Sequence, residues 1–197
     1  MTITNTVEII RQQFPEYGDT QIIKDLDMSQ KLFAEETRSL RKIDIRTTPF
    51  TSLPASEATE FGIKLPLPIR CGEVIAVAFF GEDDAPIVDA LGWSYSNGFL
   101  YINDLGILIT TLPSDLKKIT IEYIGKPDTL TDLDDAFEVP EESHYGVMCD
   151  VITRYWLIKG QLQNAQFWRG EYMRYRQSAK RQVNLTFGGN IINKGAI

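Results

Sequence analysis

The sequence predicts an α+β protein: a bundle of N- and C-terminal helices, an inserted antiparallel β-sandwich-like lobe and an extended C-terminal arm. Apolar residues recur with helical spacing near both ends, whereas the middle carries short β-branched runs that alternate. With 197 residues and 43% hydrophobic content, the chain can form one domain or two small lobes. We expect N-terminal helices in residues 1–46, the β lobe in residues 61–127, a helix hairpin packing with the N-terminal helices in residues 139–182, and the arm in residues 183–197.

Two helices are predicted in the N-terminal segment. Apolar residues with helical spacing before Pro15 predict a short helix in residues 6–14. Asp19 can cap a second helix, which carries an apolar stripe to about Glu36. Residues 47–60 are rich in Thr, Ser and Pro, a composition typical of an irregular connection.

The predicted β lobe contains a hairpin signal at Asn97-Gly98. Both residues tolerate the positive φ that the centre of a type I′ turn requires, so the alternating runs on either side should pair across it. Other runs are β-branched, aromatic or alternating, and we expect a sheet or sandwich of five or six strands. The predicted strands are residues 73–80, 93–96, 99–102, 106–112 and 118–124.

The C-terminal half is predicted to form two helices. An acidic connection in residues 125–138 leads to Pro140, which can occupy the first helical position. The helix that follows, to about Ile158, is apolar round most of its circumference, so we expect protein to cover it nearly all round. Gly160 breaks this helix, and a second helix to about Ala179 should return as its antiparallel partner.

The net charge of −7 hides an uneven distribution of charge. Residues 1–150 carry 12 Lys/Arg against 26 Asp/Glu, whereas residues 151–197 carry eight against one. Such an asymmetry is typical of a binding surface, and we expect the basic residues to meet acidic surfaces of a neighbouring copy. The overall acidity argues against non-specific duplex binding. The residues of this inter-subunit charged surface are Arg169, Arg174, Arg176, Lys180 and Arg181.

The residue types needed for catalysis or metal binding are poorly placed. His144 is the only histidine, which excludes a two-histidine metal site within one chain. Its neighbour Ser143 points in a different direction on a helix, so a serine–histidine pair is not supported. The acidic run in residues 128–138 lacks the ligand spacing of a calcium-binding EF-hand. We therefore expect no catalytic residues, no metal and no cofactor.

The sequence also predicts a compartment. Cys71 and Cys149 are far apart and have apolar neighbours, so we interpret them as buried free thiols of a reducing compartment. No apolar run approaches the roughly 20 residues of a membrane-spanning helix. Residues 1–13 lack the pattern of a signal peptide. We expect no association with a membrane.

The order of elements resembles the head-to-tail adaptor, or connector ring, proteins of tailed bacteriophages. At the level of amino-acid sequence the resemblance is closest in three segments. They are the last strand ITIEY (residues 119–123), FEVPEESHY (residues 137–145), and GQLQNAQFW (residues 160–168) with Glu171 and Tyr172. The β lobe departs from the smallest, all-helical adaptors and looks like the larger variants that carry such an insertion.

This resemblance implies a structural protein of the virion neck, made in the bacterial host cytoplasm, and not an enzyme. It implies a ring of about a dozen copies, closed by identical contacts, that joins the portal protein to further neck or tail proteins. DNA passes through the lumen of such a ring without specific binding. The arm would reach the portal or a neighbouring subunit, where an extended segment can add to a sheet or lie in a groove. Its candidate contact residues are Val183, Leu185, Phe187, Ile191 and Ile192.

A second hypothesis is a carbohydrate- or protein-binding module of a phage tail or baseplate. It would use exposed aromatic side chains of the β lobe, such as Trp93, Tyr95 and Tyr101. An enzyme ranks behind both hypotheses.

Overall fold

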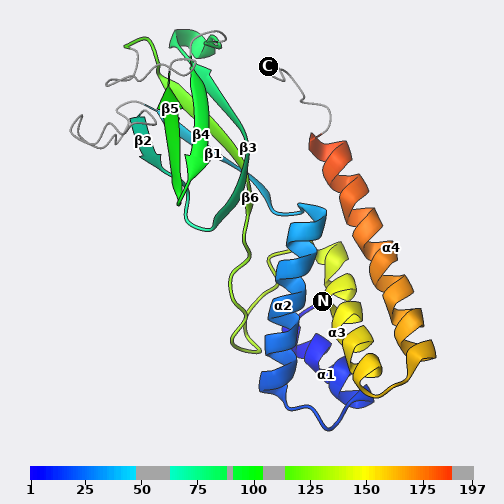
Figure 1. The fold of residues 1–197 in the computed structure, drawn as a ribbon. Helices are drawn as coiled ribbons and strands as arrows, with labels where there is room; N and C mark the ends of the chain where they lie inside the picture. The colour runs from blue at the N-terminus through cyan, green and yellow to red at the C-terminus, as the bar shows by residue number, and fades with distance from the viewer. Residues whose placement is uncertain (48–62, 88–90, 104–113, 188–197) are drawn as a thin grey trace. The chain divides into compact units, whose positions relative to one another are not determined.

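The computed structural model describes residues 1–47, 63–87, 91–103 and 114–187. Four α-helices and two three-stranded antiparallel sheets in these residues confirm the α+β class (Figure 1). The chain divides into two compact units. Residues 1–40 and 126–197 form a helical unit, and residues 41–125 form a β unit.

The helical unit contains α1 (Ile3–Gln13), α2 (Asp19–Thr37), α3 (His144–Ile158) and α4 (Leu162–Phe187). A 3-10 turn, Glu141–Ser143, precedes α3. Gly18, and not the predicted Asp19, is the N-cap of α2; Asp19 lies in the first turn, where its carboxylate pairs with Arg11 at 3.0 Å. Thr2 caps α1 through a side-chain bond to the Asn5 amide.

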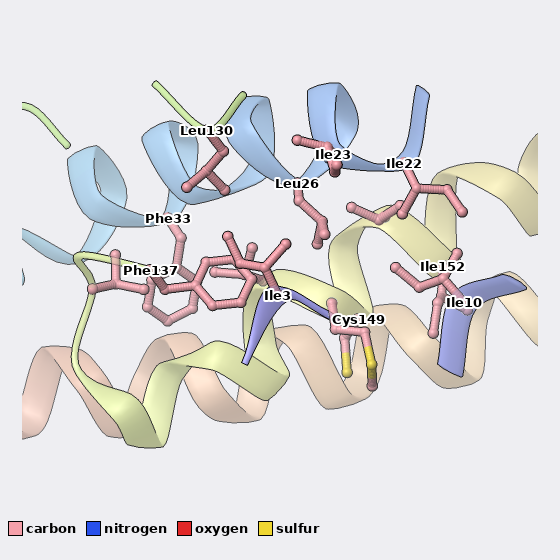
Figure 2. Packing of buried hydrophobic residues seen from close by; sticks show 14 of the residues in the cluster. Ile3, Ile10, Ile22, Ile23, Leu26, Phe33, Leu130, Phe137, Cys149 and Ile152 are labelled. Atoms are coloured by element: carbon pink, nitrogen blue, oxygen red, sulfur yellow. The ribbon is translucent and has the colours of Figure 1, made fainter. Parts of the chain in front are cut away.

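The core of this unit lies where α1, α2 and α3 meet (Figure 2). Helix α3 is buried on almost every side along its first three turns, as its apolar circumference predicts. The connection between the two units also contributes, because Leu130 and Phe137 are buried in the same cluster. Fully buried side chains of the cluster include Ile3, Ile10, Ile22, Leu26, Phe33, Cys149 and Ile152.

Helix α4 continues through the start of the segment that the sequence predicts as an extended arm. The prediction of an arm from Val183 is therefore wrong for residues 183–187, which are helical. Val183 lies one turn after buried Ala179 and is itself half-buried, so it extends the packed stripe of the helix. Between Gly170 and Gly188 the sequence has no glycine that would favour an earlier end of the helix. Residues 188–197, with Ile191 and Ile192, lie outside the described residues.

The β unit has two sheets. In the first, β1 (Arg41–Thr47) and β3 (Cys71–Phe80) flank β6 (Lys118–Gly125). In the second, β2 (Ile63–Pro66) and β4 (Gly92–Ser96) flank β5 (Phe99–Asn103). Leu65, Leu100, Ile102, Ile119 and Ile121 are buried in one cluster that both sheets share.

The predicted hairpin at Asn97-Gly98 is confirmed. It joins β4 to β5, and the two residues have φ values of 51° and 80°, as a type I′ turn requires. The strands predicted at residues 73–80 and 118–124 are also present. The strand predicted at residues 106–112 lies outside the described residues.

Strand β1 was not predicted, because residues 41–46 were assigned to the N-terminal helices. It pairs antiparallel with β6, placing Ile43 opposite Glu122 and Ile45 opposite Thr120 on the outer face of the sheet. Both isoleucines are exposed, while Asp44 lies opposite buried Ile121 on the core side. Charged residues that point inward are a feature of protected edge strands.

The contact of α3 with α4 depends on Gly146. A methyl group at this position would lie 2.8 Å from Cβ of Tyr175 and 3.0 Å from the ring of Phe33. We expect Gly146→Ala to lower the free energy of unfolding by about 1–3 kcal/mol, because the helices must move apart. Urea unfolding measures this loss.

Gly170→Ala is the matched control, since a methyl group there meets nothing within 4 Å of the described atoms. This variant should gain up to about 1 kcal/mol from helix propensity. Equal stability of the two variants would contradict the close packing at Gly146.

Candidate functional site

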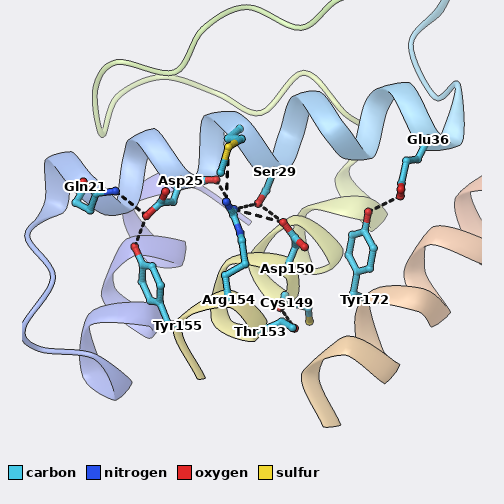
Figure 3. A network of polar contacts seen from close by, with 11 residues as sticks. Gln21, Asp25, Ser29, Glu36, Cys149, Asp150, Thr153, Arg154, Tyr155 and Tyr172 are labelled. Atoms are coloured by element: carbon cyan, nitrogen blue, oxygen red, sulfur yellow. Dashed lines mark hydrogen bonds and ion pairs between the residues drawn. The ribbon is translucent and has the colours of Figure 1, made fainter. Parts of the chain in front are cut away.

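A network of polar contacts joins α2 to α3 around the guanidinium of Arg154 (Figure 3). Its Nη2 donates to the Asp25 carbonyl oxygen at 2.9 Å, contacts Ser29 Oγ, and lies 3.4 Å from the Asp150 carboxylate. Ser29 Oγ donates in turn to Asp150 Oδ2 at 2.6 Å. Because Arg154 and Asp150 neutralise each other and also bind groups of α2, the network holds the two helices together.

Two tyrosines reinforce this packing. The Tyr155 hydroxyl donates to Asp25 Oδ2 at 2.7 Å, and the Tyr172 hydroxyl of α4 donates to Glu36 Oε2 at 2.6 Å. Burial and the facing carboxylates raise the pKa of both phenols above the usual value. Both tyrosines are therefore neutral donors at physiological pH, which suits a structural clamp.

His144 is held by backbone oxygens. Its Nδ1 lies 2.9 Å from the Met1 carbonyl oxygen and its Nε2 lies 2.9 Å from that of Val139. The ring also lies 4.8 Å from the ring of Phe137. Since both nitrogens are engaged in this way, neither is directed at Ser143 as a catalytic base would be. A pocket of about 340 Å³ adjoins the ring, lined by Met1, Thr2, Thr4, residues 133–137 and His144.

The acidic connection between β6 and α3 is held in a defined conformation. Asp135 accepts hydrogen bonds from the amides of Thr131 and Asp132, which lowers the pKa of its carboxyl. Gln30 of α2 donates to the Asp128 carbonyl oxygen at 3.1 Å and accepts from the Glu138 amide. The described residues contain no group of three or more potential metal ligands.

The two cysteines are free thiols and lie in different units. Cys149 is buried, as predicted, whereas Cys71 is half-buried. Burial raises the pKa of the Cys149 thiol to about 12, so this side chain is an inert part of the core.

The five basic residues predicted to form an inter-subunit surface all lie on α4, but they differ in their partners. Arg176 Nε lies 2.9 Å from Glu36 of α2, and Arg174 pairs with Glu171 at 2.6 Å. Arg169 and Arg181 are exposed and Lys180 is half-buried; within the described part of the chain these three form no ion pair.

The acidic connection and α4 lie on opposite sides of α2 (Figure 1). One side of α2 binds the connection through Gln30 and through Asp27, which accepts from the Leu130 amide at 3.0 Å. Its other side binds α4 through Glu36. The helical unit is therefore acidic on one flank, where Asp132 and Asp134 are exposed, and basic on the other.

Two of the three aromatic residues of the second hypothesis share a face of the sheet, where the ring centres of Trp93 and Tyr95 lie 6.4 Å apart with 26° between the ring planes. Trp93 and Tyr95 lie on the same face of the sheet as their cross-strand partners on β5, the buried residues Ile102 and Leu100. Tyr101 pairs with Ser94 and therefore lies on the other face of the sheet.

Sequence reasoning missed the exposed apolar end of the α3–α4 hairpin. Ile158 and Leu162 have the helical spacing of core residues, but they are 70% and 63% exposed. The prediction that protein covers α3 nearly all round is therefore wrong for its last turn. The apolar residues on both sides of Gly160 could have indicated this exposed surface, because the end of a helix hairpin has fewer neighbouring elements to cover it.

The chain matches no known family model, and no curated protein is significantly similar to it. In the described residues, no helix combines the length and the apolar character needed to span a bilayer.

The raised pKa values of Tyr155 and Tyr172 predict an alkaline loss of stability. A phenol with a folded-state pKa above its unfolded value of 10.0 stabilises the fold fully below pH 10, and this contribution is lost as the pH rises further. The free energy of unfolding of the native protein should fall from about pH 10 upward. The Tyr155→Phe/Tyr172→Phe variant should be less stable at pH 7, by about 1–2 kcal/mol per lost hydrogen bond. Its free energy of unfolding should fall less steeply than that of the native protein as the pH rises above 10.

Urea titrations between neutral pH and pH 11 measure both slopes. Equal slopes for the two proteins would show that these phenols ionise normally.

Proposed function

We propose that this protein is a structural subunit of a ring that connects the portal to the tail in the neck of a bacteriophage virion, where it lines the DNA exit channel. The observation that carries the proposal is the opposite charge of the two flanks of the helical unit. A negative flank on one copy can bind the positive flank of the next, and identical contacts of this head-to-tail kind close into a ring.

The pairing state of the α4 side chains supports this use of the basic flank. Arg174 and Arg176 are already neutralised by their own chain, so they contribute less to an interface than the sequence suggested. Arg169, Lys180 and Arg181 are the residues that we assign to the acidic flank of a neighbour. On that flank, Asp132 and Asp134 are exposed counterparts. Exposed ion pairs are screened by salt, so the contact should weaken with ionic strength.

The C-terminal segment is the second part of the proposal. Leu185 is 83% exposed on α4 and precedes Ile191 and Ile192 in a stretch, residues 184–193, without charged residues. We assign Val183, Leu185 and Phe187, now on a helix, together with Ile191 and Ile192, to contacts with the portal or with a neighbouring copy. The acidic excess of the chain suits a lumen through which DNA passes without being bound.

A carbohydrate-binding module is the weaker proposal. Sugar rings stack on coplanar aromatic side chains, but Trp93 of the Trp93–Tyr95 pair is partly buried against the core of the β unit, and Tyr101 lies on the other face of the sheet.

Native mass spectrometry with and without a portal protein tests the proposal. We expect closed rings in the presence of the portal. The Arg169→Glu/Arg181→Glu variant should weaken assembly at least about tenfold, because it places like charges at the contact.

Lys24→Glu, which also reverses an exposed charge but lies on α2, is the matched control and should assemble normally. A native protein that forms no ring with any neck component would contradict the proposal. Unchanged assembly of the Arg169→Glu/Arg181→Glu variant would show that the basic flank does not take part in the contact.

A further inference from the structure

The turn between α3 and α4 carries a concentration of exposed apolar side chains. We call Leu157, Ile158, Leu162 and Phe167 the hairpin tip; their exposed fractions are 47%, 70%, 63% and 64%. All four lie within two helical turns of Gly160. Isolated exposed apolar residues are ordinary, but several large ones at one end of a domain are typical of a binding surface.

The hairpin tip is held rigidly by the rest of the helical unit. Lys159 pairs with Glu16 at 2.7 Å, and its ammonium lies 4.9 Å from the ring centre of Phe14. Gly160 turns the chain with a φ of 69°, a conformation that favours glycine. Since the one lysine of the turn is neutralised by Glu16, a partner can cover the apolar side chains without burying an unpaired charge there.

The other apolar feature of this helix is at its far end. Leu185 is exposed there, and Ile191 and Ile192 follow in a stretch, residues 184–193, that contains no charged residue. Burying such a stretch costs little desolvation of charge.

These two features cannot meet within one molecule. At 1.5 Å per residue, Phe187 lies about 30 Å along the helix axis from Phe167 and about 38 Å from Leu162. Ile192 is five residues beyond Phe187, and even a fully extended chain spans only about 18 Å over that length. Ile191 and Ile192 therefore fall short of the hairpin tip of their own chain.

We infer that the segment after Phe187 of one copy docks, through Ile191 and Ile192, on the hairpin tip of a second copy. Each copy then offers a tip to one neighbour and a C-terminal segment to the other. This contact is heterologous, like the charge contact of the proposed function, and repeats of it can close into a ring. The inference deepens the proposed function, but it concerns a contact between copies that needs no portal.

Photo-crosslinking of the full chain tests the inference. p-Benzoyl-phenylalanine replaces Phe167, and protein grown with ¹⁴N is mixed with protein grown with ¹⁵N before irradiation at high concentration. We expect mass spectrometry to find crosslinks from position 167 to residues 188–197, including pairs of mixed isotope. The same probe in place of Ile43, which is exposed in the β unit, should give none to these residues.

Sedimentation equilibrium supplies the second measurement. Ile158→Asp/Leu162→Asp and Ile191→Asp/Ile192→Asp should each weaken self-association at least tenfold, and the combination should weaken it no further, since both remove one contact. Ile43→Asp should leave it unchanged, and thermal unfolding checks that each variant folds.

The inference would be overturned if the crosslinked pairs never combined the two isotopes, or if position 167 crosslinked to other segments. It would also be overturned if the combined variant lost more self-association than either variant alone. Tip-to-segment crosslinks without rings on the portal would instead overturn the proposed function and leave this contact standing.

Discussion

The structure depends on the insertion of α3 between α2 and α4. Because Gly146 has no side chain, Tyr175 of α4 and Phe33 of α2 can pack directly against the backbone of α3. Arg154 of α3 adds a hydrogen bond to the backbone of α2. Together these contacts bring two distant parts of the chain, residues 1–40 and 126–187, into a single core. The β unit can therefore be an insertion, because the helical unit closes without it.

The same packing decides which charged residues remain available. Glu36 is occupied by Tyr172 and Arg176, and Asp25 and Asp150 are occupied by Tyr155 and Arg154. The carboxylates between the helices are thus committed to structure. What remains exposed is acidic on the side of the connection and basic on the side of α4. This sorting converts an uneven sequence into a molecule with two complementary flanks.

Helix α4 links the two kinds of proposed contact. Phe187 lies about 30 Å or more along this helix from the hairpin tip, and Ile191 and Ile192 follow Phe187 too closely to span that distance. An apolar surface that cannot be satisfied within one chain favours association, because the free energy of burying it is available only between copies. The charged flanks and the apolar ends therefore favour the same head-to-tail arrangement.

The sequence alone determined the elements whose signals are local. The positive φ of Asn97 and Gly98, the helical period of α2 and the alternation of β6 each act within a few residues, so they could be read before the fold was known. The charge division was equally plain, because it is a property of composition.

Tertiary structure decided everything that depends on distant neighbours. Strand β1 forms because β6, about eighty residues later, pairs with it. The alternation of apolar and polar residues in β1 covers only a few positions directly after a helix, so it did not indicate a strand by itself. Residues 183–187 stay helical because Val183 extends the stripe of α4. Ile158 and Leu162 have the periodicity of core residues, yet they are exposed because packing ends before the hairpin does. Period indicates which face of a helix is apolar, but only the assembled fold determines how far along its length that face is covered.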